Sequence, residues 1–259
     1  MIAAALSILS TLAAPLPSPW RQVAPGVETA TVADLGGDAN WAAKVLLVDP
    51  RLATFAVRFD AAKPTLVQWR QRYPSAIAIA NGSFYSADAG EVRPTCEIVQ
   101  EGRRVKGAGC QRQDALWFGA RPREVATVAQ SSIAASVRPR RFFAPSEFQA
   151  EQWTDALKSF PSLVRAGAPA CGGAHYCAES SRTAAIGQLR DGRILLFASQ
   201  WPAVRREVAR WLAEALGVTD AVNLDGGPEA TLALTGESAE DVIGTYGRGL
   251  PLVLVVLPP

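Results

Sequence analysis

The chain is divided into short apolar runs of strand length that end at turn residues. Two of them, Thr183–Leu189 and Arg193–Ser199, flank Arg190-Asp191-Gly192, and Asp-Gly accepts the positive φ of a tight hairpin turn. Ile77–Ala80 is apolar without a break, which is typical of a fully buried strand, and Pro251–Leu257 is predicted to form the last strand. The pattern predicts sheets of mixed, largely antiparallel direction.

Helices are expected at only three places. Pro64–Arg72 and Phe148–Leu157, the latter capped near Ser146, are predicted to be short helices, and apolar residues recur at helical spacing from Val204 to Leu216, where Gly217 follows as a cap. With 49% hydrophobic and 19% charged residues, the chain can bury one large core. We therefore expect an α+β fold: a single domain, residues 20–259, of mixed, largely antiparallel sheets with a few outer helices.

Further strands are predicted at Lys44–Val48 and Thr54–Phe59, as an antiparallel pair around Asp49-Pro50, and at Ala115–Phe118, Val125–Val128, Asp220–Leu224 and Ala230–Leu234.

The first 19 residues resemble a secretory signal peptide and a proline-rich linker. Met1–Ala14 is apolar and small, and Pro15–Pro19 interrupts the run, although no Lys or Arg precedes it. The segment predicts export to the periplasm or the medium, and a cytosolic chain with a loose N-terminus is the alternative. No other apolar stretch has membrane-spanning length, so no membrane span is expected.

Four cysteines form two close pairs along the sequence. Proximity favours disulfides Cys96–Cys110 and Cys171–Cys177 in an exported protein, whereas a cytosolic chain would keep reduced thiols. Neither spacing is that of a C-x-x-C zinc site, and the chain has one histidine, so no metal site is expected from this set.

Charge and motifs argue against several function classes. The chain has 26 basic and 24 acidic residues, net +2, so no nucleic-acid partner is predicted. His175, the only histidine, lies between Cys171 and Cys177, and no G-x-S-x-G elbow occurs, which disfavours a serine hydrolase. Because no P-loop or dinucleotide fingerprint occurs, no cofactor is expected.

Two predicted strands end in asparagine followed by small residues: Asn81-Gly82-Ser83 and Asn223-Leu224-Asp225-Gly226-Gly227. Glycine lets a backbone approach a ligand closely, and successive N–H groups can face an anion. Taken alone, each motif also fits an ordinary turn.

Their order along the chain carries more information. Asn81-Gly-Ser-Phe-Tyr85, Pro161-Ser-Leu-Val-Arg-Ala-Gly167, Ser181-Arg-Thr-Ala-Ala-Ile-Gly187 and Asn223-Leu-Asp-Gly-Gly227 follow one another as in the phosphodiester glycosidase family, which the chain resembles from about Ile77 to its end. Family members commonly continue Asp-Gly-Gly with Gly and then Ser or Thr, whereas here Pro228 and Glu229 follow. The resemblance implies a hydrolase that cleaves a sugar-1-phosphate diester, releasing the sugar and a phosphomonoester.

The resemblance and the chemistry together assign roles. Cleavage at the anomeric carbon builds an oxocarbenium-like sugar and a negative phosphate, so a carboxylate and guanidinium groups are needed. Asp225 is the expected carboxylate, Arg182 the leading phosphate ligand and Arg165 the second. Asn81, with the amides of Gly82 and Ser83, is expected to orient the sugar or phosphate; the remaining substrate-binding candidates are Asn223, Gly226, Gly227 and Glu229.

Several alternatives stay open from the sequence. Glu229 is either a second carboxylate or an exposed loop acid, and Asp225 with Asn223 leaves room for a divalent cation. The partner is a small-molecule or glycan phosphodiester; the sequence does not indicate an oligomeric state. The alternative from a different class of function is a non-catalytic envelope protein that binds phosphorylated glycans, and Pro228 and Glu229 keep this alternative open.

Overall fold

The computed structural model describes residues 19–88, 90–120, 140–172, 175–236, 242–244 and 247–259. Residues 1–18 of the predicted leader and the predicted strand Val125–Val128 lie outside these ranges. Within them, no helix has the length and apolar character required to cross a membrane.

The largest sheet has eight strands and contains the predicted hairpin. Its neighbouring strands all pair antiparallel, and Gly192 adopts φ +84° in the turn between β16 and β17, as the Asp-Gly sequence predicts. In spatial order the strands are β1 (Arg21–Ala24), β2 (Val27–Thr31), β3 (Ala43–Val48), β17 (Ile194–Ser199), β16 (Ala184–Leu189), β19 (Val218–Asn223), β13 (Ser162–Arg165) and β14 (Ala168–Pro169).

Two smaller sheets pack with it. The four-stranded sheet has the order β20 (Leu232–Leu234), β5 (Ala78–Asn81), β21 (Leu252–Leu257) and β4 (Thr54–Phe59). The five-stranded sheet has the order β11 (Phe142–Phe143), β10 (Leu116–Ala120), β12 (Asp155–Ser159), β8 (Ile98–Gln100) and β9 (Arg103–Val105). Two strand pairs complete the set: β6 (Tyr85–Asp88) with β7 (Glu91–Pro94), and β15 (Ser180–Ser181) with β18 (Ala203–Val204).

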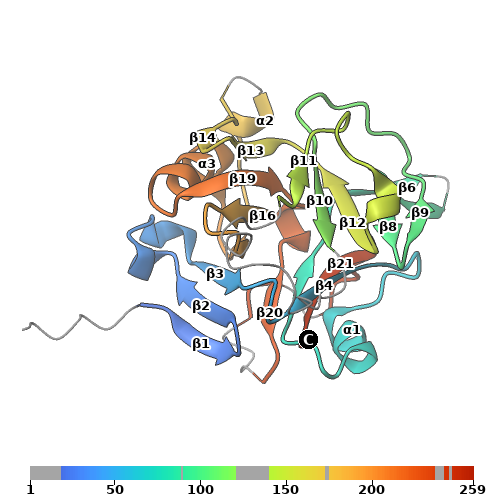
Figure 1. Cartoon of the computed structure of the whole chain (residues 1–259), viewed down its shortest axis with the longest axis horizontal. Helices are drawn as coiled ribbons and strands as arrows, with labels where there is room; N and C mark the ends of the chain where they lie inside the picture. The colour runs from blue at the N-terminus through green and yellow to red at the C-terminus, as the bar shows by residue number, and fades with distance from the viewer. Residues whose placement is uncertain (1–18, 89, 121–139, 173–174, 237–241, 245–246) are drawn as a thin grey trace, which may run out of the picture.

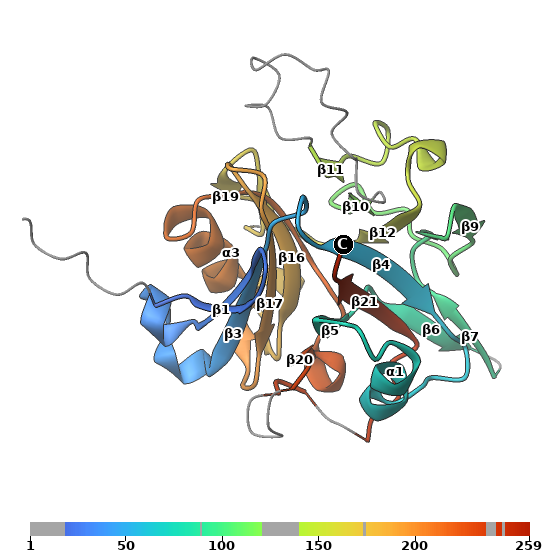
Figure 2. The same ribbon diagram turned by 60° about the horizontal axis from the view of Figure 1, so that its bottom comes forward.

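Helices cover the outer faces of the sheets. Figure 2 shows α3 (Arg205–Glu214) on one side of the eight-stranded sheet and α1 (Leu66–Arg72) beyond the four-stranded sheet. Thr65 and Gln68 form a capping box at the start of α1. The remaining helical turns are α2 (His175–Ala178), η1 (Ala33–Leu35), η2 (Ala39–Trp41), η4 (Ala150–Gln152) and η5 (Gly227–Glu229). The expected α+β class, with largely antiparallel sheets and a few outer helices, is confirmed.

Burial on both faces explains the unbroken apolar runs. Along β3, Leu46 and Val48 enter the core shared by the three large sheets, whereas Val45 and Leu47 face the layer under α3. Strand β21 alternates in the same way between the shared core and the cluster beneath α1. Because neither face meets water, the polar alternation of a surface strand is absent.

Two sequence predictions are wrong in detail. The strands at Lys44–Val48 and Thr54–Phe59 exist, but they do not pair with each other: β3 lies between β2 and β17, and β4 pairs with β21. The turn at Asp49-Pro50 therefore carries the chain from one sheet to another.

The helix expected over Phe148–Leu157 is also absent. That segment holds the short turn η4 and then β12, an interior strand of the five-stranded sheet. The Asp155 carboxylate accepts hydrogen bonds from Val57 N at 3.0 Å and Arg58 Nη1 at 2.5 Å. These long-range bonds and the sheet pairing outweigh the local helical pattern.

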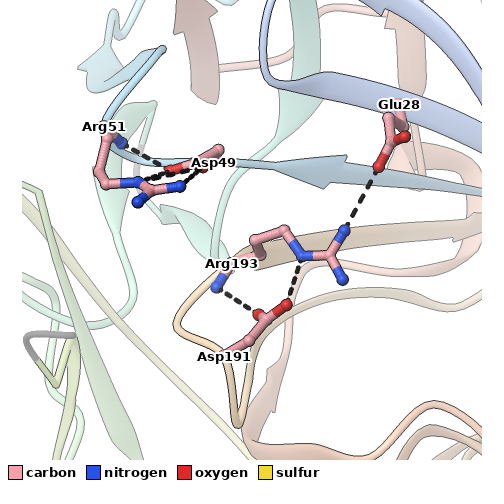
Figure 3. Close-up of polar contacts among 5 residues, drawn as sticks. All are labelled: Glu28, Asp49, Arg51, Asp191 and Arg193. Atoms are coloured by element: carbon pink, nitrogen blue, oxygen red, sulfur yellow. Dashed lines mark hydrogen bonds and ion pairs between the residues drawn. The ribbon is translucent and has the colours of Figure 1, made fainter. Parts of the chain in front are cut away.

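Cross-links and ion pairs fix the loops. The predicted disulfides Cys96–Cys110 and Cys171–Cys177 are both present. Figure 3 shows Arg193 at the β16–β17 hairpin between Asp191, at 2.7 Å, and Glu28 of β2, at 3.3 Å. Beside them, Arg51 pairs with Asp49 in the turn between the sheets.

Candidate functional site

The two asparagine motifs meet at the ends of β5 and β19. The Asn81 side-chain amide donates to the Asp225 carbonyl oxygen at 2.7 Å, and Asp225 N donates to the Gly82 carbonyl oxygen at 3.0 Å. Asn81 Oδ1 accepts a hydrogen bond from Thr231 N at 2.8 Å. Motifs that lie 144 residues apart in sequence are thus bonded into one unit that joins two sheets.

These bonds show that Asn81 and Gly82 hold the backbone of the junction together. The Asn81 side chain is 1% exposed and bonded to backbone groups through both of its polar atoms. Gly82 N donates to the Leu252 carbonyl oxygen at 2.8 Å, so it is not free to bind an anion as the sequence predicts. A side chain at Gly82 would also strike Leu252, because a Cβ there would lie 2.5 Å from Leu252 Cγ.

Asn223 and Ser83 are buried beside this junction. Asn223 Nδ2 donates to the Leu224 carbonyl oxygen at 2.6 Å, and Ser159 Oγ donates to the Asn223 carbonyl oxygen at 2.5 Å. Among the described residues, Asn223 Oδ1 and Ser83 Oγ have no hydrogen-bond partner. Both atoms therefore keep hydrogen-bonding capacity next to the unit.

Glycine is required in the loop that follows Asp225. Gly227 N donates to the Arg182 carbonyl oxygen at 2.8 Å, and a Cβ at Gly226 would lie 2.7 Å from that same oxygen. Gly227 has φ +58°, a conformation that favours glycine. The loop is thereby pressed against the backbone at the start of β16, and Gly226 N donates to Asp225 Oδ1 at 2.9 Å.

Asp225 is an unusual carboxyl group. Burial raises its pKa to about 7, and the negative charge of Glu229 adds to the rise; the Gly226 N–H and the Arg248 charge oppose it. A carboxyl that titrates near neutral pH can exchange a proton during a reaction under physiological conditions.

Glu229 is a second buried carboxylate and not an exposed loop acid. Glu229 is 8% exposed, and Arg248 Nε and Nη2 each lie 2.7 Å from Glu229 Oε1. The Tyr85 hydroxyl donates to the same oxygen at 3.3 Å. The pKa of Tyr85 is raised by burial and then by the charges of Glu229 and Asp225, so all three groups share one electrostatic environment.

Sequence reasoning missed three residues here: Tyr85, Arg248 and Lys63, whose Nζ lies 4.7 Å from the centre of the Tyr85 ring. Tyr85 ends the first asparagine motif, which was a usable signal. Arg248 and Lys63 lie outside the motifs that resemble the family, and the fold brings them to Glu229 and Tyr85.

Arg182 lies at the site but is bonded to the backbone. Its Nη2 donates to the Ala230 carbonyl oxygen at 2.6 Å and its Nε to the Ser199 carbonyl oxygen at 3.4 Å. Burial lowers the pKa of the guanidinium, and the Glu229 charge acts in the opposite direction. Arg205 lies nearby, with Nη2 bonded to Ser181 Oγ at 2.7 Å and 3.8 Å from the Cβ position of Gly226.

Arg165 is not brought to the site. It lies at the end of β13, where its Nε is 4.0 Å from Asp220 Oδ1 near the start of β19. Asp225 follows the opposite end of that strand. The structure thus separates Arg165 from the other predicted residues.

The alternative of a divalent cation at Asp225 and Asn223 finds no ligand cluster among the described residues. Across the described ranges, no group of three or more His, Cys, Asp and Glu side chains could hold an ion. The chemistry offered by the site is that of two carboxyl groups, a phenol and cationic side chains.

One comparison with known proteins identifies a family. The family model described as phosphodiester glycosidase matches residues 74–257. No curated protein matches the chain significantly.

Three solved structures share the fold at low sequence identity. The catalytic domain of zebrafish N-acetylglucosamine-1-phosphodiester alpha-N-acetylglucosaminidase, auto-inhibited by its pro-peptide, superposes with a TM-score of 0.58 at 17% identity, over 84% of this chain and 77% of that one. A hypothetical protein from Synechocystis gives 0.57 at 14% identity, over 91% of this chain but 62% of its own length. A putative exported protein from Burkholderia pseudomallei K96243 gives 0.54 at 16% identity, over 83% and 74%.

Proposed function

The chain belongs to the phosphodiester glycosidase family, and from that premise we propose that it is a hydrolase that cleaves the glycosidic bond of a sugar-1-phosphate diester. The products are the free sugar and a phosphomonoester. The zebrafish enzyme with a similar fold carries this type of bond in its name, which supports the substrate class.

One observation carries the proposal: the half-buried carboxyl group of Asp225 and the buried one of Glu229 lie on a single loop, with the guanidinium groups of Arg248 and Arg182 close to Glu229. Paired carboxyl groups are the recurring machinery of glycoside hydrolysis. The carboxylate of Asp225 accepts a proton from water as the oxygen of that water attacks the anomeric carbon. The bond from this carbon to the phosphate oxygen breaks, and its electron pair remains on the phosphate.

Because the leaving group is a phosphate, the second carboxyl group does not have to act as a strong general acid. A phosphomonoester leaves more readily than an alkoxide, so no strong general acid is required. Glu229, fixed by Arg248 and Tyr85, contributes negative charge that stabilises the oxocarbenium-like sugar. Arg182 holds the loop through hydrogen bonds with Ala230 and Gly227, and its positive charge favours the departing phosphate.

Export is part of the proposal. The two disulfides favour an oxidising compartment, and one protein of similar fold is described as a putative exported protein. The predicted signal segment is consistent with this location.

The test measures release of sugar from a panel of sugar-1-phosphate diesters, N-acetylglucosamine diesters included. Asp225→Asn is expected to lower turnover by about 10²–10⁴-fold. Asp220→Asn is the matched control, because Asp220 is another half-buried acid of raised pKa that lies near the far end of β19. A wild-type protein that binds phosphorylated glycans saturably but hydrolyses no diester would instead support the non-catalytic binding function.

A further inference from the structure

We infer that Lys63 binds the phosphate group of the substrate, on the side of the site formed by Tyr85, Glu229 and Arg248. The inference rests on the proposed function, which supplies the phosphodiester. It changes the sequence-based assignment, in which Arg182 and Arg165 hold the phosphate.

The hydrogen bonds of the neighbouring cations favour Lys63. Arg182 donates to two backbone carbonyl oxygens, and Arg248 donates to Glu229. Arg205 is bonded to Ser181, Tyr176 and Glu179. Lys63, in contrast, forms no ion pair or side-chain hydrogen bond with the described residues and has three N–H donors for a ligand.

The backbone holds Lys63 in place. The residue has φ +52°, and its N–H donates to the Asp60 carbonyl oxygen at 3.1 Å. A Cβ at Gly249 would lie 2.5 Å from the Lys63 carbonyl oxygen and 2.7 Å from Lys63 Cβ, so only glycine permits this contact. Because Gly249 follows Arg248, the contact brings Lys63 and Arg248 to the same side of the site.

The Tyr85 ring orients the ammonium group. Lys63 Nζ lies 4.7 Å from the ring centre, a distance at which a cation is attracted to the π face. The hydroxyl of the same ring donates to Glu229. The Tyr85 side chain therefore lies between Lys63 and Glu229, which places the ammonium group on the Glu229 side of the proposed site.

The chemistry of the leaving group gives this position a function. A phosphodiester carries one negative charge, and the monoester that departs gains a second as the glycosidic bond breaks. A cation fixed beside the phosphate interacts more strongly with the departing group than with the bound substrate, and so accelerates the reaction. It also selects anionic diesters over neutral glycosides.

The experiment separates phosphate binding from turnover. Inorganic phosphate is titrated calorimetrically into the wild type, Lys63→Met, Lys63→Arg and Lys106→Met, the last an exposed lysine that follows β9. We expect Lys63→Met to weaken phosphate binding about tenfold to hundredfold, the range for loss of one charge-assisted hydrogen bond. Lys63→Arg should retain most of the affinity, and Lys106→Met should bind as the wild type does.

The outcomes distinguish this inference from the proposed function. If Lys63→Met binds phosphate as tightly as the wild type, or if the wild type does not bind phosphate, the inference is wrong, whatever the enzyme hydrolyses. If Lys63→Met loses phosphate binding while no diester is hydrolysed even by the wild type, the phosphate site stands and the proposed reaction fails. Circular dichroism on each variant confirms that the fold is intact.

Discussion

The Asn81 side-chain amide donates a 2.7 Å hydrogen bond to the carbonyl oxygen of Asp225 and so ties the end of β5 to the end of β19. The two strands belong to different sheets, and Asp225, the carboxyl group of the proposed reaction, lies at their junction. Asn81 is bonded to backbone groups and is 1% exposed, so its side chain holds the backbone at Asp225 in place.

Replacing Asn81 by Asp tests this support. The variant keeps the shape of the side chain but turns both donated hydrogen bonds into contacts between oxygen atoms in a buried place. We expect the free energy of unfolding, measured in urea at neutral pH, to fall by about 2–4 kcal/mol. Asn40→Asp, at an exposed asparagine, is expected to change it by less than about 0.5 kcal/mol. Equal effects of the two changes would contradict the supporting role.

The contact between Gly226 and Arg182 leads to a second prediction. An alanine at position 226 would place its Cβ 2.7 Å from the Arg182 carbonyl oxygen, so the loop must move and carry Asp225 with it. We expect Gly226→Ala to lower kcat/KM for a diester substrate about a hundredfold, as a displacement near 1 Å can do. Gly172→Ala, where a Cβ meets nothing within 4 Å, is the control and should be as active as the wild type. Full activity of Gly226→Ala would show that the loop position is not critical.

Substitutions of Arg165 and Arg182 distinguish the sequence-based assignment of the phosphate ligands from the arrangement in the structure. Arg182→Ala removes the donor to the Ala230 carbonyl oxygen and a positive charge beside Glu229, and we expect it to lower kcat/KM at least tenfold. Arg165→Ala, beside Asp220 in the first half of β19, should leave kcat/KM within about twofold of the wild type. A large loss for Arg165→Ala would restore the sequence-based assignment.

Local patterns predicted the strands better than their partners. The apolar runs at β5, β16 and β21 identified strands because burial on both faces removes polar residues from them. The pairing of β3 with β17, over a long sequence separation, has no local signal, and the nearby run at β4 suggested a false hairpin. For Phe148–Leu157, the bonds from Asp155 to β4 decide the outcome, and they too are long-range.

The candidate site shows the same division. Asn81, Asp225 and Arg182 lie in motifs whose order along the chain could be read from the sequence, and the structure brings them together. Lys63 and Arg248 reach the site through the packing of Gly249 against Lys63, which depends on the fold. Arg165 belongs to the motif Pro161–Gly167, but it lies beside Asp220, and most of β19 separates it from Asp225.

The raised pKa of Asp225 predicts an activity profile. A carboxylate that accepts a proton from water must be ionised, so kcat/KM should increase as the pH rises through about 7 and then level off. The profile is measured with a diester whose own ionisation does not change between pH 5 and 9. Activity that instead declines through pH 7 would identify Asp225 as a proton donor.

The same group links the reaction to stability. A carboxyl whose pKa is higher in the folded protein than in the unfolded chain binds more protons when folded. Its contribution to stability is complete below pH 3.8, the ordinary value, and is lost as the pH rises through about 7, where the folded protein must hold the charge. The rise corresponds to at most about 4 kcal/mol at pH 8.

Asp225→Asn keeps the shape of the side chain but never ionises. We therefore expect the variant to match the wild type in unfolding free energy near pH 4 and to exceed it at pH 8, by up to about 4 kcal/mol, while its turnover is lost. Urea denaturation of both proteins at the two pH values gives the comparison. If the variant were less stable than the wild type at pH 8, Asp225 would be held as a favourable ion and not as the carboxyl group of raised pKa that the proposed reaction uses.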